Sequence, residues 1–164
     1  MRKIIAAILI VAALAACTSI DCPVQNLVYT NYFLKKPGGT DADTLGTDTL
    51  WIKTTRVNGT DTLVQNGLCG DVTTFTMYIS YTQPEDVFVT LLCDTSGNAL
   101  LDTIRIKKDN IARFESVDCQ AAYFHKITAV SITHNAFDSL TIHHSDVDYD
   151  IKQTHFYLYL KTQR

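Results

Sequence analysis

Residues 73–81 read TTFTMYISY, a stretch in which polar and apolar side chains alternate. One face of the extended chain would carry Phe75, Met77, Ile79 and Tyr81, and the other would carry hydroxyl groups and Tyr78. Successive side chains of a β-strand point to opposite faces of the sheet. The alternation therefore predicts a strand in a sheet that buries one face and leaves the other in water.

Segments on both sides of this strand carry turn residues that predict two hairpins. Residues 51–56 and 60–64 flank Asn58-Gly59, a pair that tolerates positive φ and so predicts a type I′ turn. Residues 87–93 and 99–106 flank a longer loop that contains Gly97. Further strands are expected over 27–34, 124–133, 140–143 and 156–160.

These eight or nine short strands predict an all-β fold, an antiparallel β-sandwich of the immunoglobulin type or a similar one. No segment keeps the apolar period and the end caps of a helix. The chain has 164 residues, of which 46% are hydrophobic and 19% charged, and its net charge is −3. This composition excludes a disordered, collagen-like or strongly nucleic-acid-binding protein and predicts a single domain over residues 27–164.

The first residues have the layout of a secretory signal. A basic start precedes the apolar run 4–16, which is shorter than the about 20 residues that cross a bilayer. The run ends in Leu14-Ala15-Ala16-Cys17, which resembles a bacterial lipobox. The resemblance implies that residues 1–16 are a lipoprotein signal peptide and that Cys17 is lipidated, with palmitate among its acyl chains. Residues 17–26 would then be a lipidated tether.

Thr18, directly after the lipidated cysteine, bears on the location of the protein. Gram-negative lipoproteins with Asp at this position typically stay in the inner membrane, so Thr18 predicts passage to the outer membrane. The acidic run that is typical of surface export is missing, since only Asp21 lies nearby. We therefore expect the protein on the periplasmic face of the outer membrane, with the cell surface as the alternative.

Four further cysteines suit an oxidising compartment, in which disulfides form. They are Cys22, Cys69, Cys93 and Cys119, and four cysteines allow three pairings. We favour Cys22–Cys119, which would tie the tether to the domain, with Cys69–Cys93 as the second pair. Cys93 also fits a small buried apolar residue on a strand.

Several motifs in a fixed order resemble one known family. The lipobox cysteine is followed by Cys22-Pro23, an Asp-Thr-Leu strand and the Asn-Gly hairpin, and Asp102-Thr103-Ile104 leads to Asp118-Cys119. Asp138-Ser139-Leu140 then precedes a last strand rich in Phe, Tyr and Leu. This order is similar to that of small lipoproteins of Bacteroides-like bacteria, named only as a domain of unknown function. The family usually has Cys-Gly where this chain has Cys119-Gln120, and the likeness implies a compartment and a fold.

A tripeptide of Asp, then Thr or Ser, then an aliphatic residue occurs five times. It resembles the O-glycosylation acceptor motif of Bacteroides-type bacteria. The acceptors would be Thr44, Thr49, Thr62, Thr103 and Ser139, and the first two lie in or beside the loop-like segment 36–46. The alternative is structural, because Asp often ends a turn and a β-branched residue often begins a strand.

The densest polar cluster lies within residues 143–150. It contains His143, His144, Asp146, Asp148 and Asp150, which are weak candidates for metal ligands. A helix–loop–helix calcium loop needs Gly and Glu at fixed positions, where this chain has Ile151 and Tyr157. We therefore expect an acidic loop between two strands, no metal and no cofactor.

Recognisable catalytic motifs are missing from the sequence. It has no Gly-x-Ser-x-Gly elbow, phosphate-binding loop or dinucleotide fingerprint. The aromatic residues Tyr78, Tyr157 and Tyr159 could form a face that binds glycan or protein, or could cover a second sheet. We expect a non-catalytic, lipid-anchored envelope protein that interacts with an unidentified envelope protein or assembly and binds no nucleic acid. The alternatives are a glycan- or metal-binding module and an undetected periplasmic hydrolase.

Overall fold

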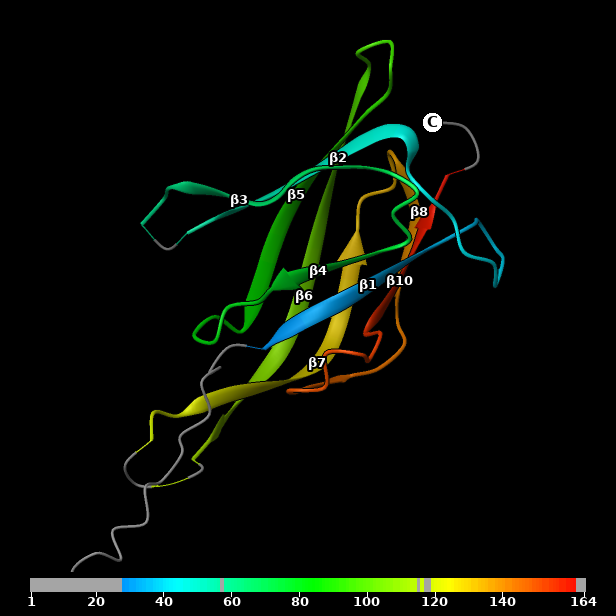
Figure 1. Ribbon diagram of the computed structural model, residues 1–164. Coiled ribbons are helices and arrows are strands. Elements are labelled where there is room, and N and C mark those ends of the chain that lie inside the picture. Colours follow the sequence, from blue (N-terminus) through cyan, green and yellow to red (C-terminus); the bar gives the residue numbers. More distant parts are fainter. Residues whose placement is uncertain (1–27, 57, 115, 117–118, 162–164) are drawn as a thin grey trace, which may run out of the picture.

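The computed structural model describes residues 28–56, 58–114, 116 and 119–161 (Figure 1). These residues form ten strands and no helix. The strands are β1 (Tyr29–Lys35), β2 (Gly46–Thr55), β3 (Asp61–Gly70), β4 (Thr74–Tyr78), β5 (Glu85–Cys93), β6 (Ala99–Arg113), β7 (Ala122–Ile132), β8 (Phe137–Ile142), β9 (Asp146–Val147) and β10 (Phe156–Leu160). Within the described ranges, no helical segment has the length and apolar character to cross a bilayer. The predicted signal peptide, 1–16, and the predicted tether, 17–26, both lie outside these residues.

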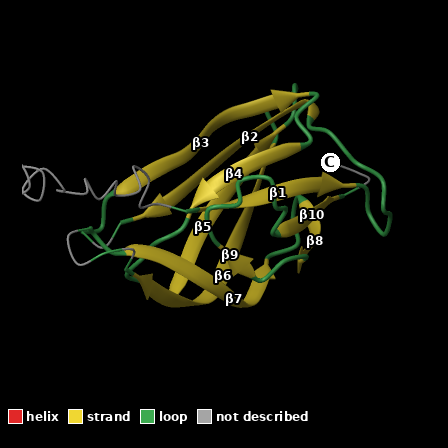
Figure 2. Ribbon diagram, turned by 60° about the horizontal axis from the view of Figure 1, so that its bottom comes forward, coloured by secondary structure: helices red, strands yellow, loops and turns green. Residues whose placement is uncertain are grey.

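The strands form two sheets that pack face to face. The smaller sheet has the order β4-β1-β10-β8, and the larger has the order β3-β2-β5-β6-β7-β9. Figures 1 and 2 show the smaller sheet lying across β5 and β6 of the larger one. The predicted all-β sandwich is therefore confirmed. Nine of the ten strands overlap the expected segments, and the tenth, β9, has only two residues.

One strand pair differs from the antiparallel prediction. β1 and β10 run parallel in the middle of the smaller sheet, with Tyr32 opposite Phe156 and Leu34 opposite Leu158. Every other strand pair that the described residues form is antiparallel. A short hairpin forces its two strands to be antiparallel, but no hairpin joins the first and last strands. The prediction of a purely antiparallel sandwich is wrong at this pair.

The alternation of residues 73–81 is confirmed in β4 and the residues that follow it. Phe75, Met77 and Ile79 are buried between the sheets, whereas Tyr78 is 60% exposed. Tyr81 departs from the prediction, since it lies beyond the end of β4 and is 50% exposed. β4 is an edge strand of its sheet, because its single neighbour in the strand order is β1.

The hairpin of β2 and β3 forms, but with a different turn. The Arg56 carbonyl accepts the Gly59 N–H at 2.8 Å, and the Arg56 N–H donates to the Thr60 carbonyl at 2.9 Å. Gly59 has φ +81°, and none of the described residues other than glycine has a positive φ. A type I′ turn needs positive φ at Asn58 as well, so this prediction is wrong. The pattern is that of the three-residue hairpin loop, in which glycine alone takes the left-handed conformation.

Asp102 on β6 is a buried carboxylate that fixes the turn between β7 and β8. It is 1% exposed, and its Oδ1 accepts hydrogen bonds from the Thr133 hydroxyl at 2.6 Å and the Asn135 backbone N–H at 2.8 Å. Its Oδ2 accepts from the backbone N–H groups of Ala136 and Phe137. Donors on both oxygens compensate the loss of hydration, as a buried carboxylate requires.

The structure contradicts one of the two predicted disulfides. Cys69 on β3 and Cys93 on β5 are free thiols, so the predicted bond between them does not form. β2 lies between these two strands, which places them two strand spacings apart, about 9.5 Å. A disulfide joins Cα atoms that are at most about 7 Å apart. Cys119 is disulfide-bonded, and Cys22, the partner that the sequence predicts for it, lies outside the described residues.

Candidate functional site

A groove opens between the β2–β3 hairpin, β5 and the connection from β4 to β5. Its volume is about 1020 Å³. Its lining includes Thr54 and Arg56 of the hairpin, Tyr78 and Tyr81 at and after the end of β4, and Val87 of β5. Ligand sites are concave and mostly apolar, with a few polar groups that set orientation. This groove is therefore the candidate site.

Two tyrosines line the groove, and the ring of each packs against a second ring. The Tyr78 ring meets Tyr29 of β1 edge to face, with centroids 5.6 Å apart and planes at 87°. The Tyr81 ring lies 5.3 Å from Tyr123 of β7, with planes at 30°. Aromatic pairs in such geometries attract one another. Both exposed rings are thus held in place before any ligand arrives.

Uncharged polar side chains supply most of the other hydrogen-bonding groups. They are the hydroxyls and amides of Thr54, Thr55, Asn58, Ser80, Thr82 and Gln83. Charges of both signs also reach the groove, from Arg56, Glu85 and Asp86. Glu85 forms a long ion pair with Arg105 at 3.8 Å.

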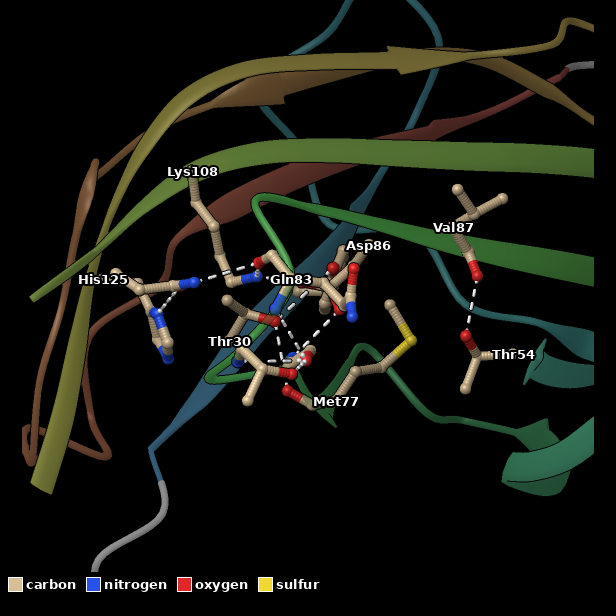
Figure 3. A network of polar contacts seen from close by, with 12 residues as sticks. Thr30, Thr54, Met77, Gln83, Asp86, Val87, Lys108 and His125 are labelled. Atoms are coloured by element: carbon tan, nitrogen blue, oxygen red, sulfur yellow. Dashed lines mark hydrogen bonds and ion pairs between the residues drawn. The ribbon is translucent and has the colours of Figure 1, made fainter. Parts of the chain in front are cut away.

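Asp86 belongs to a buried polar network beneath the groove (Figure 3). Lys108 Nζ on β6 lies 2.6 Å from Asp86 Oδ2, and the two side chains are 0% and 9% exposed. The same ammonium donates to the Gln83 carbonyl at 2.7 Å, while Asp86 Oδ1 accepts the Ser80 backbone N–H at 2.9 Å. The network joins β5, β6 and the β4–β5 connection, so it fixes the wall that carries Tyr81.

Burial dominates the protonation of this network. It raises the pKa of Asp86, while hydrogen bonding to Lys108 and to the Ser80 N–H acts in the opposite direction. His125 of β7 lies beside Lys108 (Figure 3), and burial, helped by the lysine charge, lowers its pKa to about 4. The imidazole is therefore neutral at pH 7, with Nδ1 2.8 Å from Asn110 Oδ1.

The arrangement suits binding. Both oxygens of Asp86 are engaged by donors of the fold. Ser80 Oγ lies 3.2 Å from the Thr82 hydroxyl and accepts the Gln83 N–H, which are bonds within the turn. These polar groups hold the connection in shape, while the rings of Tyr78 and Tyr81 remain exposed to a ligand.

The structure spreads out the predicted His/Asp cluster. His143 stacks on Tyr157, with ring centroids 4.3 Å apart. The carboxylates of Asp148 and Asp150 accept backbone N–H groups two residues further along, as in Asx turns. Nowhere in the described ranges do three or more His, Cys, Asp or Glu side chains converge as metal ligands. His144 lies near His155, with ring centroids 6.3 Å apart, and Asp146 lies 3.9 Å from Lys126.

His155 is a buried histidine with a structural contact. Its Nδ1 accepts the Asn31 backbone N–H at 3.0 Å, and the His155 backbone N–H donates to the Asn31 carbonyl at 2.9 Å. Burial, followed by the neighbouring His144, lowers its pKa. The neutral ring that this contact requires is thus the favoured form.

The candidate glycosylation acceptors are all half-buried. Four of them lie in strands, namely Thr49 in β2, Thr62 in β3, Thr103 in β6 and Ser139 in β8. Thr44 lies in the loop before β2. Asp102, which precedes Thr103, accepts hydrogen bonds from the turn between β7 and β8. That occurrence of the tripeptide therefore has a structural explanation.

The predicted aromatic face is divided between two places. Tyr78 lines the groove, whereas Tyr157 and Tyr159 lie on β10 in the smaller sheet, where Lys35 Nζ stands 3.5 Å from the Tyr157 ring centroid. Sequence reasoning missed Tyr81 as a groove residue. The alternation of residues 73–81 assigned Tyr81 to the buried face, but the strand ends at Tyr78 and the alternation does not hold beyond Ile79. Sequence reasoning also missed Lys108, although Lys108 continues the inward series of Ile104 and Ile106.

Two family models match the chain. The model of a family of unknown function (DUF6452) matches residues 49–160, and the model of the prokaryotic membrane lipoprotein lipid attachment site matches residues 1–18. No curated protein and no solved structure matches the chain. The predicted likeness to a small lipoprotein family of unknown function is confirmed. The lining residues of the groove, together with Lys108 and His125, lie within the matched region.

Proposed function

Given that this chain belongs to the DUF6452 family of unknown function, we propose that it binds a component of the cell envelope in its groove, without catalysis. It is a lipid-anchored envelope protein, because its first 18 residues match a lipoprotein attachment site. Thr18 favours the outer membrane and its periplasmic face as the location.

The observation that carries the proposal is the pair of exposed tyrosines on the groove. Tyr78 and Tyr81 are 60% and 50% exposed, although each ring is held by an aromatic neighbour. Tyrosine is enriched at binding surfaces, since it supplies a large apolar area and a polar tip with little loss of conformational entropy. The polar groups around Asp86 are engaged by the fold, which supports binding over hydrolysis.

Site-specific photo-crosslinking in the native envelope tests this function. A photoreactive phenylalanine would replace Tyr78 or Tyr81 in the full lipidated protein, and Tyr149 in the control. Tyr149 is also exposed, at 37%, but packs on Phe124 of β7 and does not line the groove. We expect the same adduct from both groove positions and none from the control. Equal labelling at all three positions, or no adduct, would overturn the proposal.

The covalent state of the mature protein is proposed with the function. Cys17 would carry diacylglycerol and an amide-linked acyl chain such as palmitate, and Cys22 would pair with Cys119. Thr44 is the best placed glycan acceptor, because it lies outside the strands. Intact mass spectrometry would show the lipid, and a glycan mass that disappears in Thr44→Ala. An unglycosylated mature mass would refute the glycan.

A further inference from the structure

We propose that the ligand of the groove is a neutral oligosaccharide, which stacks its sugar rings on Tyr78 and Tyr81. The inference rests on the proposed binding function and names the chemical class of the ligand. Its three supports are the aromatic wall, the charge of the lining, and the size and edge of the groove.

The aromatic wall offers flat apolar surfaces beside polar groups. A sugar ring is amphipathic in the same way, with C–H groups on its faces and hydroxyls around its rim. Tyr78 and Tyr81 present exposed rings, which Tyr29 and Tyr123 hold at centroid distances of 5.6 and 5.3 Å. Side chains that are already ordered lose less entropy on binding. Stacking on such rings therefore favours binding more than stacking on freely rotating tyrosines.

The charge of the lining favours an uncharged ligand. Arg56 and Glu85 bring opposite charges to the groove, and the carboxylate of Asp86 is neutralised by Lys108 at 2.6 Å. The remaining polar side chains are hydroxyls and amides. Hydroxyls and amides carry both donor and acceptor atoms, as sugar hydroxyls do. The Thr54 and Thr55 hydroxyls already donate within the fold, to the Val87 carbonyl and to Asp61, and keep acceptor capacity for a ligand. An acidic polymer would find no excess of positive charge here.

The size and edge of the groove favour a chain of sugars over an extended peptide. At about 1020 Å³, the groove matches the upper end of the range for small-ligand sites, about 300–1,000 Å³. A peptide that added to the edge strand β4 would need its free backbone groups. The side-chain amide of Gln65 already donates to the Thr76 carbonyl of β4, which occupies one of these acceptors.

Binding measurements on the full lipidated protein in nanodiscs test the inference. The probes are cello-, malto-, manno-, xylo- and N-acetylchito-oligosaccharides, with oligogalacturonate as the anionic comparison and no glycoside detergent present. We expect saturable binding of at least one neutral probe, and weaker binding of oligogalacturonate. Tyr78→Ala and Tyr81→Ala should each lower the affinity about five- to tenfold, whereas Tyr149→Ala should leave it unchanged.

The outcomes separate this inference from the proposed function. Absence of binding by every neutral probe, or an affinity that the groove variants leave unchanged, overturns the oligosaccharide. If crosslinked adducts still form at positions 78 and 81 in the envelope, the groove remains a binding site, but for another class of ligand. Each ring is exposed and packs against one aromatic neighbour, so the variants should unfold only a few degrees below the parent and remain folded in the binding assay. If an alanine variant is unfolded under the assay conditions, Tyr78→Leu or Tyr81→Leu takes its place.

Discussion

The ammonium of Lys108 lies 2.6 Å from the carboxylate of Asp86, and almost no solvent reaches either side chain. Removing two charges from water costs free energy, which their attraction and further hydrogen bonds must offset. Here the further bonds come from the Gln83 carbonyl and the Ser80 N–H. The pair thus links the core to the wall of the groove.

Lys108→Met should destabilise the protein by about 3–5 kcal/mol, because it leaves the Asp86 carboxylate buried without a counter-charge. The double variant Lys108→Met/Asp86→Leu should recover most of that loss, since no buried charge remains. Urea unfolding at pH 7 measures both free energies. A single variant as stable as the parent would contradict the burial of the pair.

The pH dependence of stability should show the buried His125. Its folded pKa, about 4, lies below the ordinary value of 6.5, so the unfolded chain binds the proton more readily. His125 therefore contributes its full stabilisation above about pH 6.5 and loses it as the pH falls towards 4. The raised pKa of Asp86 acts in the opposite sense, because the folded carboxyl takes up a proton before the unfolded one as the pH falls.

A His125→Gln variant separates these two contributions, since Asp86 is common to both proteins. The free energy of unfolding of the parent should fall more steeply than that of the variant between pH 6.5 and 4. Urea titrations at several pH values give the two slopes. Parallel curves would show that His125 titrates normally in the fold.

Asp102→Ala should cost about 2–5 kcal/mol of stability, because it leaves the buried N–H groups of Ala136 and Phe137 without an acceptor. Asp138→Ala is the matched control, since Asp138 is exposed near the start of β8, just after the same turn, and begins the same kind of tripeptide. Its effect should stay within about 0.5 kcal/mol. Thermal unfolding compares the two, and equal losses would argue against the anchoring role of Asp102.

Thiol counting should find two free cysteines in the native protein without reductant. Cys69 is exposed and should react with a maleimide faster than the half-buried Cys93. Peptide mapping after labelling locates the modified residues. A native protein with no reactive thiol would mean that these two cysteines pair, against the strand order of the larger sheet.

Local sequence patterns predicted most of the strands, whereas the pairing of strands that are distant in the sequence could not be predicted. Nine strands could be located from runs of strand-forming residues between turn residues, such as the alternation of Phe75, Met77 and Ile79, because these signals act within a few residues. The parallel pairing of β1 with β10 joins residues 124 positions apart, which no local signal can specify. β9, with two residues, is too short to show any period.

The site was less accessible to sequence reasoning than the fold. Tyr78 was recognised as an exposed aromatic residue, but its proximity to Thr54 and Val87 depends on how the two sheets meet. Lys108 reads as a surface residue, since lysine is rarely buried, and only its counter-charge on β5 explains its position. A lysine at an inward position of a long strand is the signal that could have revealed it.

The parallel contact of β1 with β10 sets an order of events during export. A secreted chain crosses the membrane with its amino end first, so β1 emerges close to the lipid anchor and long before β10. The smaller sheet stays incomplete until the last strand arrives and enters between β1 and β8. β1 can pair with β4 early, but its second partner is the last strand of the chain. A chain cut short before β10 would therefore keep its predicted anchor and lack the strand that joins β1 to β8.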